Sequence, residues 1–162
     1  MDEEGFSGCD GRTTIFDWWS VASVRRLRKL ISSGAYRSST VSELVDGGLT
    51  KEEAEIFLRF TGAIRFAAED TAISKGTTYD LCWCNMSSDG FDKNRHFAFL
   101  RDFEEHTLLI AVNFSGHESV MKLVIPQHAF EWMGIPESEE LHPESIIEVR
   151  VPSMDGVVIQ LI

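Results

Sequence analysis

The spacing of apolar residues changes at Thr77, and this change constrains the fold more than any other feature of the sequence. Before Thr77, apolar residues recur every three or four positions, as they do on one face of a helix. After it, they alternate with polar residues in short stretches, as in strands that bury one face. The sequence therefore predicts an α+β chain, with a helical segment over residues 1–76 and an antiparallel β-sandwich of about six to eight strands over residues 77–162.

Two main helices are expected in the helical segment. The first begins at the N-cap residue Ser20 and ends at the C-cap glycine Gly34. The second begins with a capping box at Thr50 and Glu53, in which each side chain satisfies a free backbone amide of the other residue, and it ends at Gly76. The apolar stripe of the second helix comprises Ile56, Phe57, Phe60, Ile64 and Ala67. We expect this stripe to lie in the core.

Strands and turns are expected throughout the second segment. The strands cover residues 78–84, 95–103, 107–114, 119–125, 146–151 and 157–162. Polar stretches at 104–106, 115–118 and 154–156 predict hairpins between successive strands, and the Asp-Gly pair in the last of them is the strongest signal. Residues 127–134 follow a proline and predict one helical turn.

Charge and composition exclude several classes of partner. A net charge of −11 disfavours nucleic acid and anionic membrane surfaces, because both are bound by clustered Lys and Arg. No apolar run approaches the ~20 residues of a membrane span, and the first residues form no secretory signal. The three cysteines form no disulfide pattern. We therefore expect a cytoplasmic protein that binds neither nucleic acid nor membrane, unless the chain is a piece of a longer protein with a signal peptide upstream.

No catalytic or metal-binding pattern is present in the sequence. Cys82 and Cys84 are expected on one face of a strand, where their separation is too wide for an easy disulfide, so buried free cysteines are the better interpretation. The five histidines lack metal-ligand spacing, and no serine lies in a G-x-S-x-G elbow. Adjacent acidic residues lie at a helix start, a turn and a loop, where carboxylates are usually solvated. We expect no metal, no cofactor and no catalytic residue.

Several stretches of the chain, in order, are similar to one known family. Residues 91–101 and 108–115 contain a strand ending in Phe-Leu-Arg, an acidic turn and an aliphatic strand ending in Asn-Phe-Ser. This pattern, continued at 124–135, resembles the C-terminal sandwich of alpha-amylase-type glycoside hydrolases. Residues 5–19 resemble the segment after the eighth barrel strand in a bacterial branch of that family, although Trp-Trp stands where Tyr-Trp is expected. Residues 72–81 resemble its junction between barrel and sandwich.

The resemblance implies that the chain is the end of a catalytic barrel followed by the C-terminal sandwich. Family members cut α-glucosidic bonds with an Asp nucleophile, a Glu acid and a second Asp on earlier barrel strands, all of which would precede Met1. No residue of this chain inherits those roles, and we expect the chain to be inactive alone. The loop of Asp10 and Arg12 lies on the substrate side of the barrel in the family, so these residues either touch substrate or only brace the loop.

Three functions remain open from the sequence. The chain is the non-catalytic C-terminal portion of an amylase-type enzyme, with the missing barrel as its partner. Alternatively it is a carbohydrate-binding accessory module for α-glucan, in which Trp19, Trp83 and Trp132 are either sugar platforms or core residues. In the third hypothesis the helices bury their apolar stripes in a homo-oligomer.

Overall fold

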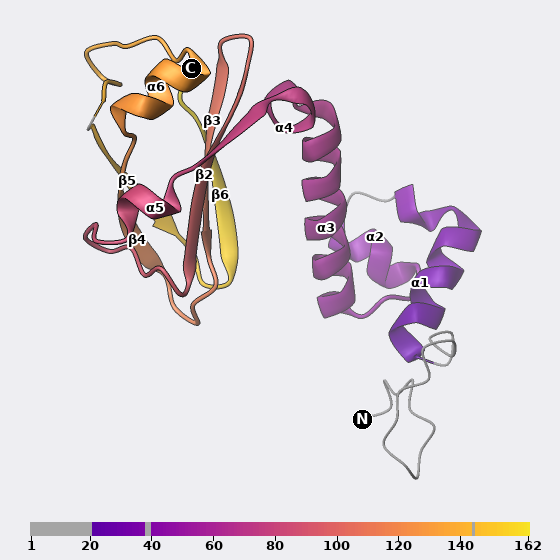
Figure 1. Cartoon of the computed structure of the whole chain (residues 1–162). Helices are drawn as coiled ribbons and strands as arrows, with labels where there is room; N and C mark the ends of the chain where they lie inside the picture. The colour runs from indigo at the N-terminus through magenta and orange to yellow at the C-terminus, as the bar shows by residue number, and fades with distance from the viewer. Residues whose placement is uncertain (1–20, 38–39, 144) are drawn as a thin grey trace, which may run out of the picture. The chain divides into compact units, whose positions relative to one another are not determined.

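The computed structural model describes residues 21–37, 40–143 and 145–162. The chain divides into two compact units, unit 1 over residues 1–66 and unit 2 over residues 67–162. Within the described ranges, six α-helices and six strands follow one another with most of the helices first (Figure 1). This arrangement confirms the predicted α+β class.

Three α-helices lie in the described part of unit 1. They are α1 (Ala22–Ser33), α2 (Val41–Asp46) and the first part of α3 (Lys51–Glu69), with a 3-10 helix at Ala35–Arg37. Gly34 ends α1 in the left-handed conformation at φ 79°, as predicted, whereas the predicted N-cap Ser20 lies outside the described residues. The capping box of α3 is confirmed, since Thr50 Oγ1 accepts from the Glu53 amide at 3.2 Å and the Glu53 carboxylate accepts from the Thr50 amide at 2.8 Å.

Among its described residues, unit 1 has a small buried core. Its fully or nearly fully buried residues are Leu30, Leu44, Leu49 and Ala54. A bidentate ion pair joins α1 to α3, because Arg26 donates to both carboxylate oxygens of Glu53 at 2.6–3.1 Å. The hydrogen bond from Arg26 lowers the pKa of Glu53 below its usual value, and the amide and hydroxyl of Thr50 lower it further against the effect of burial.

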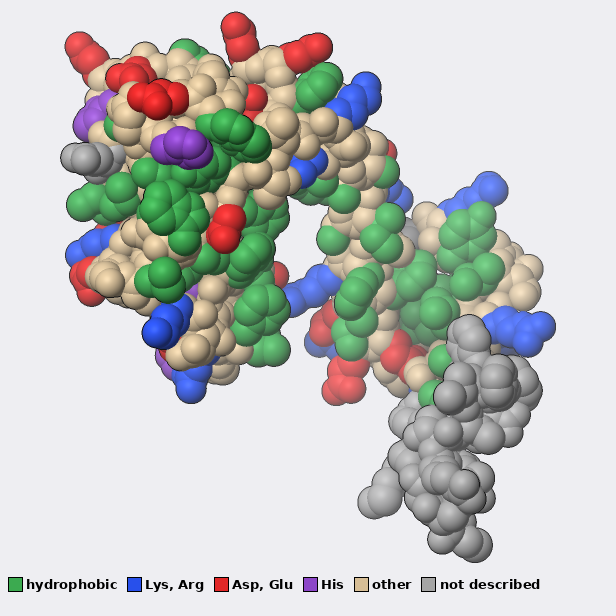
Figure 2. Space-filling view, in the orientation of Figure 1, with side chains coloured by type: hydrophobic (Ala, Val, Ile, Leu, Met, Phe, Trp, Pro, Cys, Tyr) green, Lys and Arg blue, Asp and Glu red, His purple; other side chains and the backbone are tan. Residues whose placement is uncertain are grey.

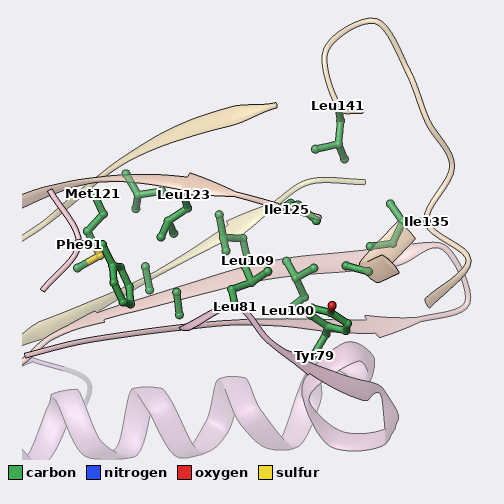
Figure 3. Packing of buried hydrophobic residues seen from close by; sticks show 14 of the residues in the cluster. Tyr79, Leu81, Phe91, Leu100, Leu109, Met121, Leu123, Ile125, Ile135 and Leu141 are labelled. Carbon is green, nitrogen blue, oxygen red and sulfur yellow. The ribbon is translucent and has the colours of Figure 1, made fainter. Parts of the chain in front are cut away.

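Unit 2 is a sandwich of two antiparallel sheets. The larger sheet has the order β1-β2-β3-β6, formed by Thr77–Asp80, His96–Phe103, His106–Asn113 and Asp155–Gln160. The smaller sheet pairs β4 (Ser119–Val124) with β5 (Ile146–Val151). One face of each sheet contributes to a single core, which includes Leu100, Leu109, Met121, Leu123, Val149 and Val151 (Figure 3).

Strand β3 is buried on both faces, which explains its unbroken run of apolar residues. Leu109 and Ala111 face the sandwich core, while Leu108 and Ile110 belong to a second cluster with Ala72 of α4 (Thr71–Lys75). Arg101 fixes α4 on the sheet, since its guanidinium donates to the Ala72 carbonyl at 2.9 Å and to the Ile73 carbonyl. The arginine of the Phe-Leu-Arg motif is therefore an anchor for this short helix.

Two of the three predicted hairpins are wrong. The turn at Glu104 and Glu105 does join β2 to β3, with φ of 50° and 66° at its two residues. By contrast, the stretch at 115–118 joins β3 to β4, and 154–156 follows β5 and opens β6, so both connections cross between the two sheets. Turn chemistry signals a reversal of the chain, but it does not specify which strand pairs with which.

The first predicted strand is also only partly correct. Strand β1 ends at Asp80, and Cys82 and Cys84 lie on the short helix α5 (Cys82–Asn85). The Asp80 carboxylate starts this turn by accepting from the Cys82 amide at 2.7 Å. Both cysteines are free, as expected, but they are half-buried rather than buried, and burial raises the pKa of both thiols.

Two buried asparagines link the layers of the sandwich. Asn113, at the end of β3, donates to the carbonyls of Val151 and Pro152 after β5, at 3.2 and 3.1 Å, and to that of His117 at 2.8 Å. Asn85 forms a similar link to Val124 of β4, to which it donates at 3.0 Å and from which it accepts at 2.8 Å. The Asn-Phe-Ser motif thus contains a structural residue that joins the two sheets.

Candidate functional site

The predicted substrate-contact residues Asp10, Arg12 and Trp19 lie outside the described residues. In the part of the chain that the structure describes, no group of three or more His, Cys, Asp or Glu side chains is arranged to hold a metal ion. The same part contains no helix that is long and apolar enough to span a membrane. Among the described residues, the features with functional potential include two apolar surfaces and two clefts.

The first apolar surface, the α3 stripe, consists of Ile56, Phe60 and Ile64. The prediction that these three residues lie in the core was wrong, because Phe60 and Ile64 are 67% and 65% exposed and Ile56 is also exposed. Helix α3 has two apolar faces, and the face containing Ala54 and Leu58 packs on the small core of unit 1. Periodicity detects an apolar stripe, but it does not say whether the rest of the chain covers that stripe.

The α3 stripe borders an apolar groove of about 350 Å³. The groove is lined by Val24 and Leu27 of α1, Leu49, and Ile56, Phe57 and Phe60 of α3. Hydrophobic side chains are also visible along α3 in Figure 2. Exposed apolar area of this kind is typical of a surface that packs against a partner.

The second apolar surface is the outer face of the four-stranded sheet. Phe97 and Val158 are exposed there, and Phe99 and Val112 are partly buried. The register places Phe97 opposite Val112 and Phe99 opposite Ile110, and the two phenylalanine rings lie 5.4 Å apart. Helix α4 packs on the Ala72 cluster of this face and leaves Phe97 and Val158 open to solvent.

An aromatic cleft of about 320 Å³ lies where β1, α5 and α6 (Gln127–Met133) meet. Its lining residues are Thr78, Tyr79, Asp80, Trp83, His128 and Trp132. Trp83 and Trp132 are 54% and 55% exposed, so the interpretation of these two tryptophans as core residues was wrong. In Figure 2, hydrophobic side chains gather on the sandwich around α5 and α6.

The floor of the aromatic cleft is fixed by Tyr79. Its hydroxyl lies 3.0 Å from Nδ1 of His128, and its ring lies 6.0 Å from that of Trp132. Burial raises the pKa of this hydroxyl, and the neighbouring Cys84 raises it further, so Tyr79 is neutral and forms a fixed hydrogen bond. No sequence pattern predicted Tyr79, Asp80 and His128 as site residues, because Tyr79 and His128 are 49 positions apart and no local spacing signals their contact.

A more polar cleft of about 410 Å³ lies beside His96 and Glu118. Its charged groups are already engaged, because Arg150 pairs with Glu118 at 2.6 Å and Nδ1 of His96 accepts from the Asp92 amide at 2.9 Å. Nε2 of His96 lies 3.1 Å from the Ser119 hydroxyl, and burial lowers the pKa of this histidine. These contacts support the loop around Asp92, so the polar cleft serves the fold.

Comparison with known proteins gives similarity at the level of solved structures. No protein-family model matches the sequence, and no curated protein matches it. The structure is similar to the ligand-free cyclic alpha-maltosyl-(1→6)-maltose hydrolase from Arthrobacter globiformis, at 12% identity and a TM-score of 0.37, over 70% of this chain and 22% of that one. It is also similar to isomaltulose synthase from Klebsiella sp. LX3, at 12% identity and a TM-score of 0.45, over 98% of this chain and 33% of that one.

Both are alpha-amylase family glycoside hydrolases. The chain spans a third or less of the length of either enzyme.

Proposed function

We propose that this chain is the C-terminal, non-catalytic portion of an alpha-amylase-type glycoside hydrolase, and that it covers and stabilises a catalytic barrel. The observation that carries the proposal is the α3 stripe with its adjoining groove. Unit 1 leaves Ile56, Phe60 and Ile64 in solvent although each would contribute roughly 1.5–3 kcal/mol if it were buried. A covering partner therefore accounts for a surface that the described residues of unit 1 leave open.

The proposed partner follows from the motifs. The sequence that leads into α1 is similar to the end of a barrel, so the neighbouring barrel elements are the natural cover for the groove between α1 and α3. Aliphatic and aromatic side chains line this groove, as is typical of helices that pack on other helices. Substrate cleavage would then belong to barrel carboxylates outside this chain, and the chain itself would contribute stability.

Co-expression with a barrel tests the proposal. The chain is produced alone and together with the polypeptide that the preceding coding sequence specifies, and hydrolysis of maltooligosaccharides is measured for both samples. We expect no hydrolysis by the chain alone, and a stable complex with hydrolytic activity when the barrel is present. A preceding coding sequence that specifies no barrel, or hydrolysis by the chain alone, would contradict the proposal.

Surface variants sharpen this test. Phe60→Ser with Ile64→Ser should abolish the complex while the chain keeps its melting temperature, because both side chains are exposed. The matched control is Arg65→Gln, an exposed polar position on the same helix, which should leave the complex intact. Homo-oligomers formed through the α3 stripe are the competing outcome. Sedimentation that shows a stable dimer which the barrel does not displace would favour the homo-oligomer.

A further inference from the structure

We propose that the aromatic cleft between β1, α5 and α6 binds a neutral saccharide of the α-glucan class. The two tryptophans are the first observation. Trp83 and Trp132 come from different helices and different parts of the chain, yet both line one cleft and both remain more than half exposed. A tryptophan that serves only the core would bury most of its ring, because its large apolar area dominates its contribution to stability.

Both helices contact the sandwich core through residues other than their tryptophans. In α5, Cys82 and Cys84 contact the sandwich core while Trp83 points to solvent. In α6, Ala129 and Phe130 fill the core, and Trp132 lies on the outer side. The two rings are therefore presented outward by elements that are themselves anchored, and a rigid scaffold of this kind is what a binding site needs.

Polar groups line the same cleft as the two aromatic rings. Asp80 uses Oδ1 to accept from the Cys82 amide, and its exposed carboxylate retains acceptor capacity toward the cleft. His128 is held through Nδ1 by the Tyr79 hydroxyl, and Nε2 makes no hydrogen bond to another residue of the described ranges. A carboxylate and an imidazole at fixed positions are suited to bind neighbouring hydroxyl groups.

This combination favours a sugar over other ligands. Pyranose rings have an apolar face that stacks on indole and an edge of hydroxyl groups, and the cleft offers both kinds of contact. No Lys or Arg is among its lining residues and Asp80 is acidic, which disfavours phosphates and single-stranded nucleic acid. Its volume of about 320 Å³ is at the small end of ligand sites, so it suits a short segment of a chain.

The choice of an α-glucan rests on the proposed function, whereas the cleft itself does not. A saccharide site away from the barrel would hold the substrate polymer near the enzyme and raise its effective concentration. The expected affinity is in the millimolar range, because the cleft is open and small.

Nuclear magnetic resonance of the tryptophan side chains tests the site on the full chain. The four indole N–H signals are recorded during titration with maltoheptaose, and Trp83→Phe and Trp132→Phe assign two of them. We expect the signals of Trp83 and Trp132 to shift in a saturable way while the other two stay in place. Trp83→Ala, Trp132→Ala and Asp80→Asn should each weaken binding at least about tenfold.

A control variant and control ligands show whether binding is specific to the aromatic cleft and to α-glucan. Phe97→Ser removes an exposed aromatic residue from the outer face of the sheet and should leave the affinity unchanged. Absence of shifts with maltoheptaose, shifts with cellohexaose alone, or shifts with choline alone would each overturn the proposal. Loss of maltoheptaose binding would not affect the complex with the barrel, so the two proposals fail independently.

Discussion

The two units differ most in how much of their apolar surface they bury. Among the described residues, unit 2 has a main core of sixteen buried hydrophobic residues, whereas unit 1 has a core of four. Unit 1 nevertheless exposes the α3 stripe, in which all three side chains are more than half exposed. A small core rarely stabilises a short segment by itself. Unit 2 therefore has a core large enough to fold from its own residues, and the exposed stripe is the reason that we propose a partner for unit 1.

The largest expected effect is the loss of a sheet-to-sheet link in unit 2. Asn113→Ala removes hydrogen bonds to three carbonyls and leaves buried polar groups unpaired, so it should lower the free energy of unfolding by about 3 kcal/mol. Urea denaturation followed by circular dichroism measures this change. The exposed Asn94→Ala is the matched control and should change stability by less than about 0.5 kcal/mol. An Asn113 variant as stable as the control would show that the sheets are held by apolar packing alone.

A smaller effect of opposite sign is expected at the hairpin of unit 2. Glu104 and Glu105 both occupy positive φ, at 50° and 66°, where Asn and Gly are preferred. Glu104→Asn with Glu105→Gly should therefore raise the free energy of unfolding by about 1 kcal/mol. Thermal unfolding is the measurement, and the single change Glu105→Gly should give part of the gain. A lower melting temperature would mean that loss of the two carboxylates destabilises the hairpin more than the relief of backbone strain stabilises it.

The two units should also respond to different ranges of pH. All five histidines lie in unit 2, and two of them shift in opposite directions. Burial lowers the pKa of His96, so its contribution to stability is present above about pH 6.5 and is lost as pH falls through its folded pKa. The hydrogen bond to Asp70 raises the pKa of His106. The contribution of His106 to stability is therefore present below about pH 6.5 and is lost as pH rises through the folded pKa of His106.

Proton resonances of the two imidazole rings measure these shifts directly. We expect His96 to titrate below 6.5 and His106 above it, and Asp70→Asn should return His106 toward 6.5. Unit 1 should be insensitive in this range and lose stability only as pH falls below 4.5, because its ion pair depends on the lowered pKa of Glu53. Unit 1 unfolding near neutral pH would contradict this separation.

The smallest effect on stability is expected at the α3 stripe. Ile56→Ser with Phe60→Ser should change the melting temperature of the chain very little, because both side chains are exposed, whereas Leu44→Ala, at a buried position of the same unit, should lower the free energy of unfolding by about 2 kcal/mol. Differential scanning calorimetry compares the two variants. A large loss in the stripe variant would show that the stripe is covered within the chain itself.

Local sequence signals predicted the positions of helices and strands better than they predicted which strands and side chains contact one another. The capping box at Thr50, the C-cap at Gly34 and the span of β5 follow from a few neighbouring residues, and all three are confirmed. The crossovers after β3 and β5 and the contact of Tyr79 with His128 depend on tertiary packing, which no short window contains. The exposure of the α3 stripe was missed for the same reason, since apolar periodicity is identical whether or not a cover exists.

Hydrogen exchange of the full chain, alone and in the presence of the barrel that we propose as its partner, tests the central claim most directly. In the chain alone, amides of α3 before Phe66 should exchange much faster than those of β2 and β3, because the core beneath them is small. Binding of the barrel should slow exchange in α3 and leave β2 and β3 unchanged. Slow exchange of α3 in the chain alone, or no change on addition of the barrel, would contradict the account.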